Sequence, residues 1–317
     1  MTGRDPISKW ELRGADGSYW CIQSPDAAEW GAEGAKLGVD PKELMDVLVK
    51  TIYNSTAFQE GSTYGGKRIQ MRNPVVAFKL YDRGDGIEDM ESRFRMAWDY
   101  DVDTVLTITT YGARASRRSI ALRLGKEPEV ITPQTKDIRL IDVCKVVLTL
   151  AAGDPFFYEP DELASWTATT ANDATGTVRI SNPTDQKLWL AWELTAPGIW
   201  RIPDYSFGDN SRGWAVEHAN RVIVMPSLGV GQHVTIDTYP DHERVDSDDG
   251  SLVWARMRAI EFLYPVPPYT APIDLPVRIT QGPKGATARV RMHRRWSRPW
   301  GLQRSRLIDR SPEAITP

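Results

Sequence analysis

Alternating apolar and polar residues predict β-strands along most of this chain. The segments 10–13 and 19–23 flank a short Gly-Ala-Asp-Gly loop at 14–17, which predicts an opening β-hairpin. Further strands are predicted at residues 50–58, 68–71, 75–81, 104–111, 119–124 and 138–151. The strand at 138–151 carries apolar residues on both faces, as a strand in a sandwich or at a subunit interface requires.

One amphipathic helix interrupts this β pattern at about residues 86–98. Asp85 and Glu88 have the spacing of a capping box, with Asp85 as N-cap. Helical spacing brings one apolar stripe together, which we expect to lie on a sheet: Ile87, Met90, Phe94, Ala97 and Trp98. A weaker helix is predicted at residues 41–50.

The second half of the chain carries shorter strands, separated by frequent turn signals. They are predicted at residues 177–181, 188–194, 221–225, 233–237 and 252–260. Short antiparallel strands of this kind are typical of a sandwich or jelly roll. We therefore divide this mainly β chain into an N-terminal β domain with one helix (1–155), a β-sandwich (156–275) and a basic C-terminal strand and tail (276–317), the last following a proline-rich linker at 264–272.

Composition restricts the function further. The 317 residues suit two domains, and 41% hydrophobic with 26% charged residues favour a folded chain. The net charge of −3 gives no global attraction to nucleic acid. Two distant cysteines form neither a metal site nor a disulfide framework. No apolar run is long enough for a membrane span, and no signal sequence is apparent, so we expect synthesis in a cytoplasm without membrane insertion.

Two segments resemble ligand loops but lack essential residues. The run at 61–67 has P-loop spacing, yet Arg68 stands where Ser or Thr would hold magnesium, and a strand pattern follows. The acidic run at 99–103 begins like a calcium loop, but Thr104 and Thr110 replace the required Gly and Glu. We predict a β-turn and a solvated corner, with no cofactor or metal.

No motif indicates catalysis. The four histidines form no HExxH motif, and there is no GxSxG elbow. Paired carboxylates for glycoside hydrolysis stay open, because their spacing is set in space rather than in sequence. We predict that the protein is not an enzyme, with an envelope-degrading hydrolase as the remote alternative.

Tryptophans are concentrated in the second half, where eight of the twelve lie. Aromatic faces stack on sugars and anchor protein interfaces, so Trp189, Trp200 and Trp214 are candidates for carbohydrate or partner contact. Core packing is the competing interpretation. Strand alternation places Trp192 in the core and Trp189 on the opposite face.

The basic C-terminal segment is a second candidate surface. Residues 287–292 alternate like a half-buried strand, with arginines outward. Cationic residues with interleaved aromatics can also bind nucleic acid, but we favour docking to an acidic protein surface. The candidate docking residues are Arg289, Arg291, Arg294, Arg295, Trp296, Arg298 and Trp300.

Four stretches resemble the distal tail (Dit-like) minor tail proteins of actinobacterial long-tailed siphophages. They are residues 177–198, 234–245, 251–256 and 294–302. The resemblance covers roughly residues 150–302 in sequence. The first 150 residues resemble the family in architecture, through the opening hairpin, the single helix and the long closing strand.

This resemblance implies a structural virion protein at the tail tip, assembled in the host cytoplasm. Six copies of the N-terminal β-sandwich would form a ring that joins the tail tube and tape-measure protein to the baseplate hub and receptor-binding proteins. The second sandwich would be galectin-like or carbohydrate-binding-module-like. The alternative is an attachment protein whose second sandwich binds host cell-wall glycans.

Overall fold

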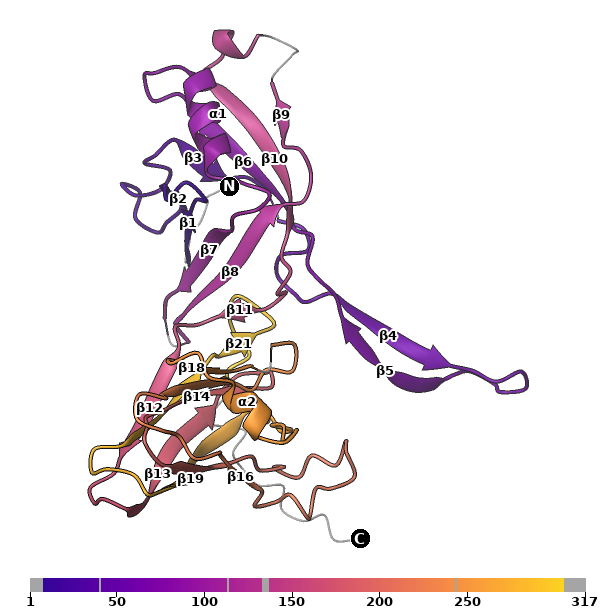
Figure 1. Ribbon diagram of the computed structural model, residues 1–317. Helices are drawn as coiled ribbons and strands as arrows, with labels where there is room; N and C mark the ends of the chain where they lie inside the picture. Colours follow the sequence, from indigo (N-terminus) through magenta and orange to yellow (C-terminus); the bar gives the residue numbers. More distant parts are fainter. Residues whose placement is uncertain (1–7, 40, 113, 133–136, 243, 305–317) are drawn as a thin grey trace. The chain divides into compact units, whose positions relative to one another are not determined.

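The computed structural model describes residues 8–39, 41–112, 114–132, 137–242 and 244–304. The chain divides into two compact units (Figure 1). Unit 1 comprises Met1–Tyr158 and Trp296–Leu302, and unit 2 comprises Glu159–Arg295 and Gln303–Pro317. Both units are built mainly of strands, so the prediction of a mainly β fold is confirmed.

Unit 1 is built on one long antiparallel sheet with the strand order β2-β1-β7-β8-β10-β6-β3. Two further short strands add to it, β9 beside β10 and β11 beside β8. The strand bounds are β1 (Ser8–Arg13), β2 (Tyr19–Gln23), β3 (Ala35–Leu37), β6 (Val75–Tyr81), β7 (Thr104–Thr110), β8 (Ser116–Leu124), β9 (Glu129–Ile131), β10 (Val143–Ala151) and β11 (Phe157–Tyr158). The short β21 (Arg295–Trp296) lies where the chain returns to this unit.

Helix α1 (Ile87–Met96) closes the core of unit 1. Its buried face and the residues after it pack on β6, with the Phe94 ring centroid 5.0 Å from that of Phe78 and Trp98 5.9 Å from the same ring. The predicted stripe is confirmed. The predicted cap is wrong, because Gly86 is the N-cap and no side chain caps the helix.

Asp82, rather than the predicted Asp85, accepts backbone hydrogen bonds just before this helix. Its carboxylate accepts the backbone N–H groups of Gly84 and Gly86, each at 2.8 Å. These hydrogen bonds favour the ionised form and lower the pKa of Asp82.

Two other predictions in unit 1 need correction. Residues 41–50 are not helical, because Lys42 exchanges both backbone hydrogen bonds with Val75 and the Leu44 carbonyl accepts from Arg72. Tertiary partners thus take the groups that a helix would use internally. The strand predicted from 138 begins at Val143, after a 3₁₀ turn η2 (Ile138–Leu140) in which Leu140 is 76% exposed.

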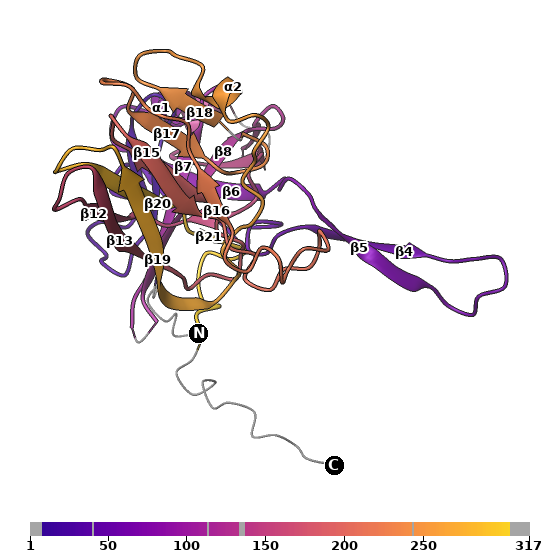
Figure 2. The same cartoon turned by 60° about the horizontal axis from the view of Figure 1, so that its bottom comes forward.

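Strands β4 (Val49–Asn54) and β5 (Thr63–Ile69) form a two-stranded hairpin that pairs with no other strand of the described chain. It extends away from the rest of unit 1 in both views (Figures 1 and 2). We call residues 49–69 the arm.

Unit 2 consists of two antiparallel sheets that share one hydrophobic core. The five-stranded sheet has the order β12-β20-β14-β17-β18 and the four-stranded sheet the order β13-β19-β15-β16. The bounds are β12 (Glu162–Thr167), β13 (Asp173–Asn182), β14 (Leu190–Leu194), β15 (Ile199–Pro203), β16 (Val222–Val224), β17 (Val234–Asp237), β18 (Arg244–Ser247), β19 (Thr270–Thr280) and β20 (Thr287–Met292). Residues 276–292, set apart by the sequence-based division, therefore supply β20 and part of β19 to this sandwich.

Two sequence predictions in unit 2 fail for local reasons. The strand expected at 252–260 is a short helix α2 (Val253–Arg256), followed by Arg258 and Ala259 at positive φ, which a strand does not accommodate. The proline-rich linker at 264–272 runs directly into β19. The prolines of β19, Pro272 and Pro276, lie where β19 pairs with β13 and not with β15, so the missing backbone N–H groups leave no β15 acceptor unpaired.

Candidate functional site

The arginines of β20 lie on the outer face of the five-stranded sheet, as the sequence predicts, but each is paired. The Arg289 Nε donates to a Glu193 carboxylate oxygen at 2.8 Å. Arg291 lies 3.7 Å from the Asp161 carboxylate. The inward residues Ala288, Val290 and Met292 are completely buried. This strand therefore offers compensated charge rather than a free basic surface.

The next two arginines are also engaged within unit 2. Arg294 forms an ion pair with Glu162 and donates to the Ser181 hydroxyl at 2.8 Å. The Arg295 guanidinium lies 4.7 Å from the centroid of the Tyr239 ring and donates to its hydroxyl at 3.1 Å. These contacts weaken the prediction that both arginines dock to an acidic partner.

The remaining docking candidates lie in a segment that completes unit 1, residues 296–302, which we call the strap. Trp296 is only 1% exposed and its ring lies 3.6 Å from the Arg118 guanidinium. Trp300 packs on the core, 6.5 Å from the Trp10 ring. Burial excludes Trp296 as an exposed docking residue in this chain. Arg298 stays at the surface, 2.9 Å from Asp46.

Two buried arginines, which the sequence analysis missed, hold the strap. Arg72 donates to the carbonyls of Leu44, Pro155 and Ser297 at 2.5–2.6 Å, and burial lowers its pKa to about 10. Arg118 donates to the carbonyls of Arg298 at 2.8 Å and Gly301 at 3.0 Å. Both residues have no exposed surface. Their roles are structural, since they satisfy backbone carbonyls that would otherwise be buried without donors.

The three candidate tryptophans have different environments. Trp200 is completely buried and its Nε1 donates to the Thr195 carbonyl at 2.7 Å, so it belongs to the core and is not a contact residue. Trp189 is half-buried, with its ring 6.4 Å from that of Tyr239. Trp214 is 47% exposed beside His218. Trp192 is in the core, as predicted.

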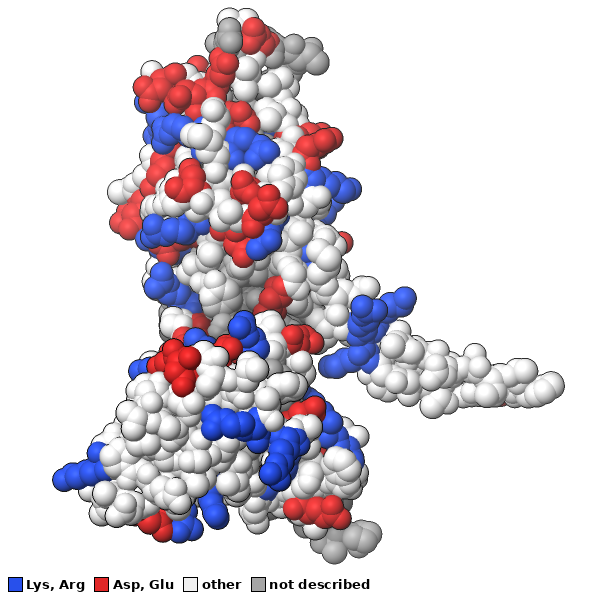
Figure 3. All heavy atoms as spheres, viewed as in Figure 1, with Lys and Arg blue, Asp and Glu red and all other residues white. Residues whose placement is uncertain are grey.

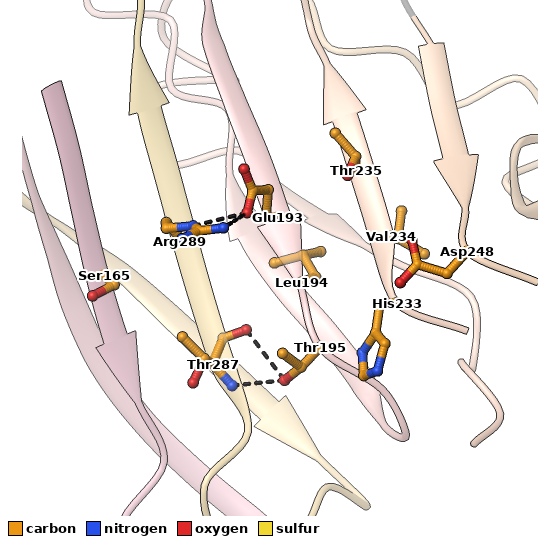
Figure 4. A pocket seen from close by; sticks show the side chains of 10 residues that line it. All are labelled: Ser165, Glu193, Leu194, Thr195, His233, Val234, Thr235, Asp248, Thr287 and Arg289. Carbon is orange, nitrogen blue, oxygen red and sulfur yellow. Dashed lines mark hydrogen bonds and ion pairs between the residues drawn. The ribbon is translucent and has the colours of Figure 1, made fainter. Parts of the chain in front are cut away.

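A polar hollow of about 330 Å³ lies on the outer face of the five-stranded sheet (Figure 4). Side chains from β12, β14, β17 and β20 line it, together with residues next to them. The ion pair of Arg289 with Glu193 crosses its middle, and Thr195 links to the backbone of Thr287 through hydrogen bonds of 2.7 and 3.3 Å. The lining combines hydroxyls, an imidazole and paired charges, which suits hydrogen bonding to a polar ligand.

The arm exposes apolar side chains without a core of its own. Five of its large residues lie on β4 and β5 and are 37–57% exposed: Val49, Ile52, Tyr53, Tyr64 and Ile69. Phe58, in the loop between the strands, is fully exposed. Lys and Arg gather at the base of the arm, and most of its visible face shows no Lys, Arg, Asp or Glu (Figure 3). The glycine-rich run at 61–67 lies in this hairpin and opens no helix.

Among the described residues, no three His, Cys, Asp or Glu side chains are arranged to hold a metal ion. The acidic corner at 99–103 instead uses Asp99 to accept the backbone N–H groups of Asp101 and Val102, and Asp103 to pair with Arg123. In the described chain, no helix combines the length and apolar character that crossing a membrane needs.

Comparison with known proteins defines the class. No family model matches the chain. It is 28% identical over 345 residues to the minor tail protein Gp27 of Mycobacterium phage D29, covering 92% of this chain and 98% of the relative. The Gp27 minor tail protein of Mycobacterium phage L5 is likewise 28% identical, over 352 residues with the same coverage.

The fold is similar to that of a solved distal tail protein. The crystal structure of SPP1 Dit (gp 19.1) superposes with a TM-score of 0.56 over 90% of this chain and 98% of that chain, at 12% identity. Relatives in sequence and likeness in fold together place the chain in one class, the structural proteins of phage tails. Within that class it is similar in sequence to minor tail proteins and in fold to a Dit protein.

Proposed function

We propose that this protein is the distal tail subunit of a long-tailed phage and that six copies close into a ring at the tail tip. Unit 1 forms the ring, which joins the tail tube and tape-measure protein to the baseplate hub and receptor-binding proteins. The tail protein names of the relatives support this role, as does the description of SPP1 Dit as a paradigm of the hub adsorption apparatus. The subunit has a structural and not an enzymatic role, and it assembles in the host cytoplasm.

The observation that carries the ring proposal is the arm. An isolated two-stranded hairpin is marginally stable in water, and surfaces of this apolar content usually mark an interaction site. Within the arm, the aromatic side chains of Tyr53 and Tyr64 contact each other, with their centroids 5.8 Å apart. A second copy is the partner that a ring provides, because each subunit then offers one arm and covers another.

The test measures mass and shape. Light scattering after size exclusion should give a particle near six times 35.7 kDa, and negative-stain microscopy should show rings. A Tyr53→Ser/Tyr64→Ser variant should shift the protein towards monomer without unfolding it.

The matched control replaces two tyrosines of unit 1 that lie outside the arm and are similarly exposed. Tyr100 is 49% and Tyr111 is 55% exposed, against 57% and 55% for the arm pair. The Tyr100→Ser/Tyr111→Ser variant should assemble like the wild type. A monomeric wild type at every concentration tested, or equal assembly of both variants, would contradict the role assigned to the arm.

A further inference from the structure

The polar hollow contains a row of side chains that runs across four strands of the five-stranded sheet. Strand register aligns Ser165 of β12 with Arg289 of β20, Arg289 with Glu193 of β14, and Glu193 with Thr235 of β17. The row therefore reads hydroxyl, guanidinium, carboxylate, hydroxyl (Figure 4). Ser165 and Thr235 form no side-chain hydrogen bond with any residue that the structure describes, so both hydroxyls are available to a ligand.

The neighbouring row supplies a fixed donor. His233 Nδ1 accepts the backbone N–H of Ala196 at 3.0 Å, so the neutral imidazole carries its proton on Nε2 and can donate from there. Thr195 and Thr287 hold the adjacent strand ends together through their hydrogen bonds. This part of the hollow is thus ordered by contacts within the sheet.

The charges in the hollow disfavour a strongly anionic ligand and a nucleic acid. Arg289 is compensated by Glu193, and Asp248 adds another carboxylate to the lining. Beside the hollow, Arg291 is paired with Asp161 and Arg244 with Asp246. A neutral molecule with many hydroxyls matches this lining, because the paired Arg289 and Glu193 can form directed hydrogen bonds without bringing net charge.

An aromatic pair continues the same face beyond the hollow. Pleat alternation places Trp189 on the side of Glu193, with the small side chain of Ala191 between them. Tyr239 follows β17 and contacts Trp189, with Arg295 stacked on its ring. Four residues along a strand span about 13 Å, a length that a short oligosaccharide covers.

We propose that this face of unit 2 binds a neutral oligosaccharide. The hollow is the polar subsite, and Trp189 with Tyr239 is the stacking subsite. A protein partner fits less well, because the centre of a protein interface is depleted of charged residues and this centre is a row of them. The proposal goes beyond the ring and does not rest on it.

The experiment uses the full-length protein. An array of neutral glucan, galactan, mannan and arabinan oligosaccharides identifies a binder, and calorimetric titration then measures its Kd. At least one of these oligosaccharides should bind with a Kd below about 1 mM. Trp189→Ala and the double variant Ser165→Ala/Thr235→Val should each weaken binding about ten-fold or more, through lost stacking and lost hydrogen bonds.

Matched controls lie elsewhere in unit 2. Trp214→Ala removes an exposed tryptophan that does not line the hollow, and Thr177→Val removes an exposed hydroxyl from the four-stranded sheet. Both should bind like the wild type, and so should the Tyr53→Ser/Tyr64→Ser arm variant. Thermal unfolding confirms that each variant is folded.

Two results would overturn the proposal. One is the absence of binding to every neutral oligosaccharide at millimolar concentration. The other is unchanged binding by Trp189→Ala and Ser165→Ala/Thr235→Val. If these variants instead lose association with another tail protein while glycan binding is absent, the face is a protein-docking surface.

Discussion

Unit 1 contains two hairpins of similar apolar content that differ in what covers them. The β1–β2 hairpin pairs with β7 and buries Trp10, Leu12, Trp20 and Ile22, all at most 4% exposed. In the arm, every residue of β4 is exposed, and within the described chain the two strands pair only with each other. The apolar residues of the arm are therefore outside the buried core of unit 1. The proposed ring would cover these residues with a neighbouring subunit.

The largest expected effect comes from truncating the covered hairpin. Trp20 is 2% exposed and its ring lies 5.2 Å from Phe94, so Trp20→Ala should lower the free energy of unfolding by about 3–5 kcal/mol. Tyr64→Ala, in the arm, should change it by less than about 0.5 kcal/mol in the monomer. Urea unfolding of the two variants under dissociating conditions measures both values. Similar losses would show that the arm is part of the core.

Replacing a buried arginine should likewise lower the free energy of unfolding more than replacing an exposed one. Arg118→Ala leaves the carbonyls of Arg298 and Gly301 without their donor and removes the cation from the Trp296 ring, so we expect a loss of about 3 kcal/mol. Arg68→Ala at the base of the arm should stay within about 0.5 kcal/mol. The melting temperatures of the two variants, measured by thermal unfolding, test this difference. Equal melting temperatures would contradict the structural role of Arg118.

The rate of thiol labelling should distinguish the buried core of unit 1 from the exposed arm. Burial raises the pKa of Cys144, in β10, from 9.0 to about 11. At pH 8 a Tyr53→Cys thiol in the monomer should therefore react at least about a hundred-fold faster than Cys144. In the ring, the arm thiol should become protected. Unchanged labelling of the arm upon assembly would count against its burial.

The pH dependence of Cys144 has a defined sign. The folded state holds the thiol proton more tightly than the unfolded state does. The stability that this thiol contributes is therefore complete below pH 9 and is lost as the pH rises towards 11. Labelling of Cys144 should accelerate across that range.

Local patterns predicted the elements whose partners are close in sequence. The hairpin at 10–23 and the buried face of α1 depend on turn residues and helical spacing, and both are confirmed. The helix expected at 41–50 was wrong because Val75 and Arg72 take its backbone groups. No periodicity within that segment carries information about those partners.

The candidate sites show the same limit more strongly. The sequence pattern places Trp296 and Trp300 on the surface of a basic tail. Trp296 instead contacts Arg118, which lies 178 positions earlier in the chain, and no local spacing could indicate that contact. The row from Ser165 to Thr235 gathers one residue from each of four strands. Only the strand register brings them together, and register follows from the fold rather than from any one segment.

Hydrogen exchange of the arm amides, in the dissociated subunit and in the assembled particle, tests whether neighbouring subunits cover the arm. We predict fast exchange across β4 and β5 in the subunit and strong protection in the particle, with β1 and β7 protected in both. Arm amides that exchange equally fast in both states would contradict the proposal that the arm joins neighbouring subunits.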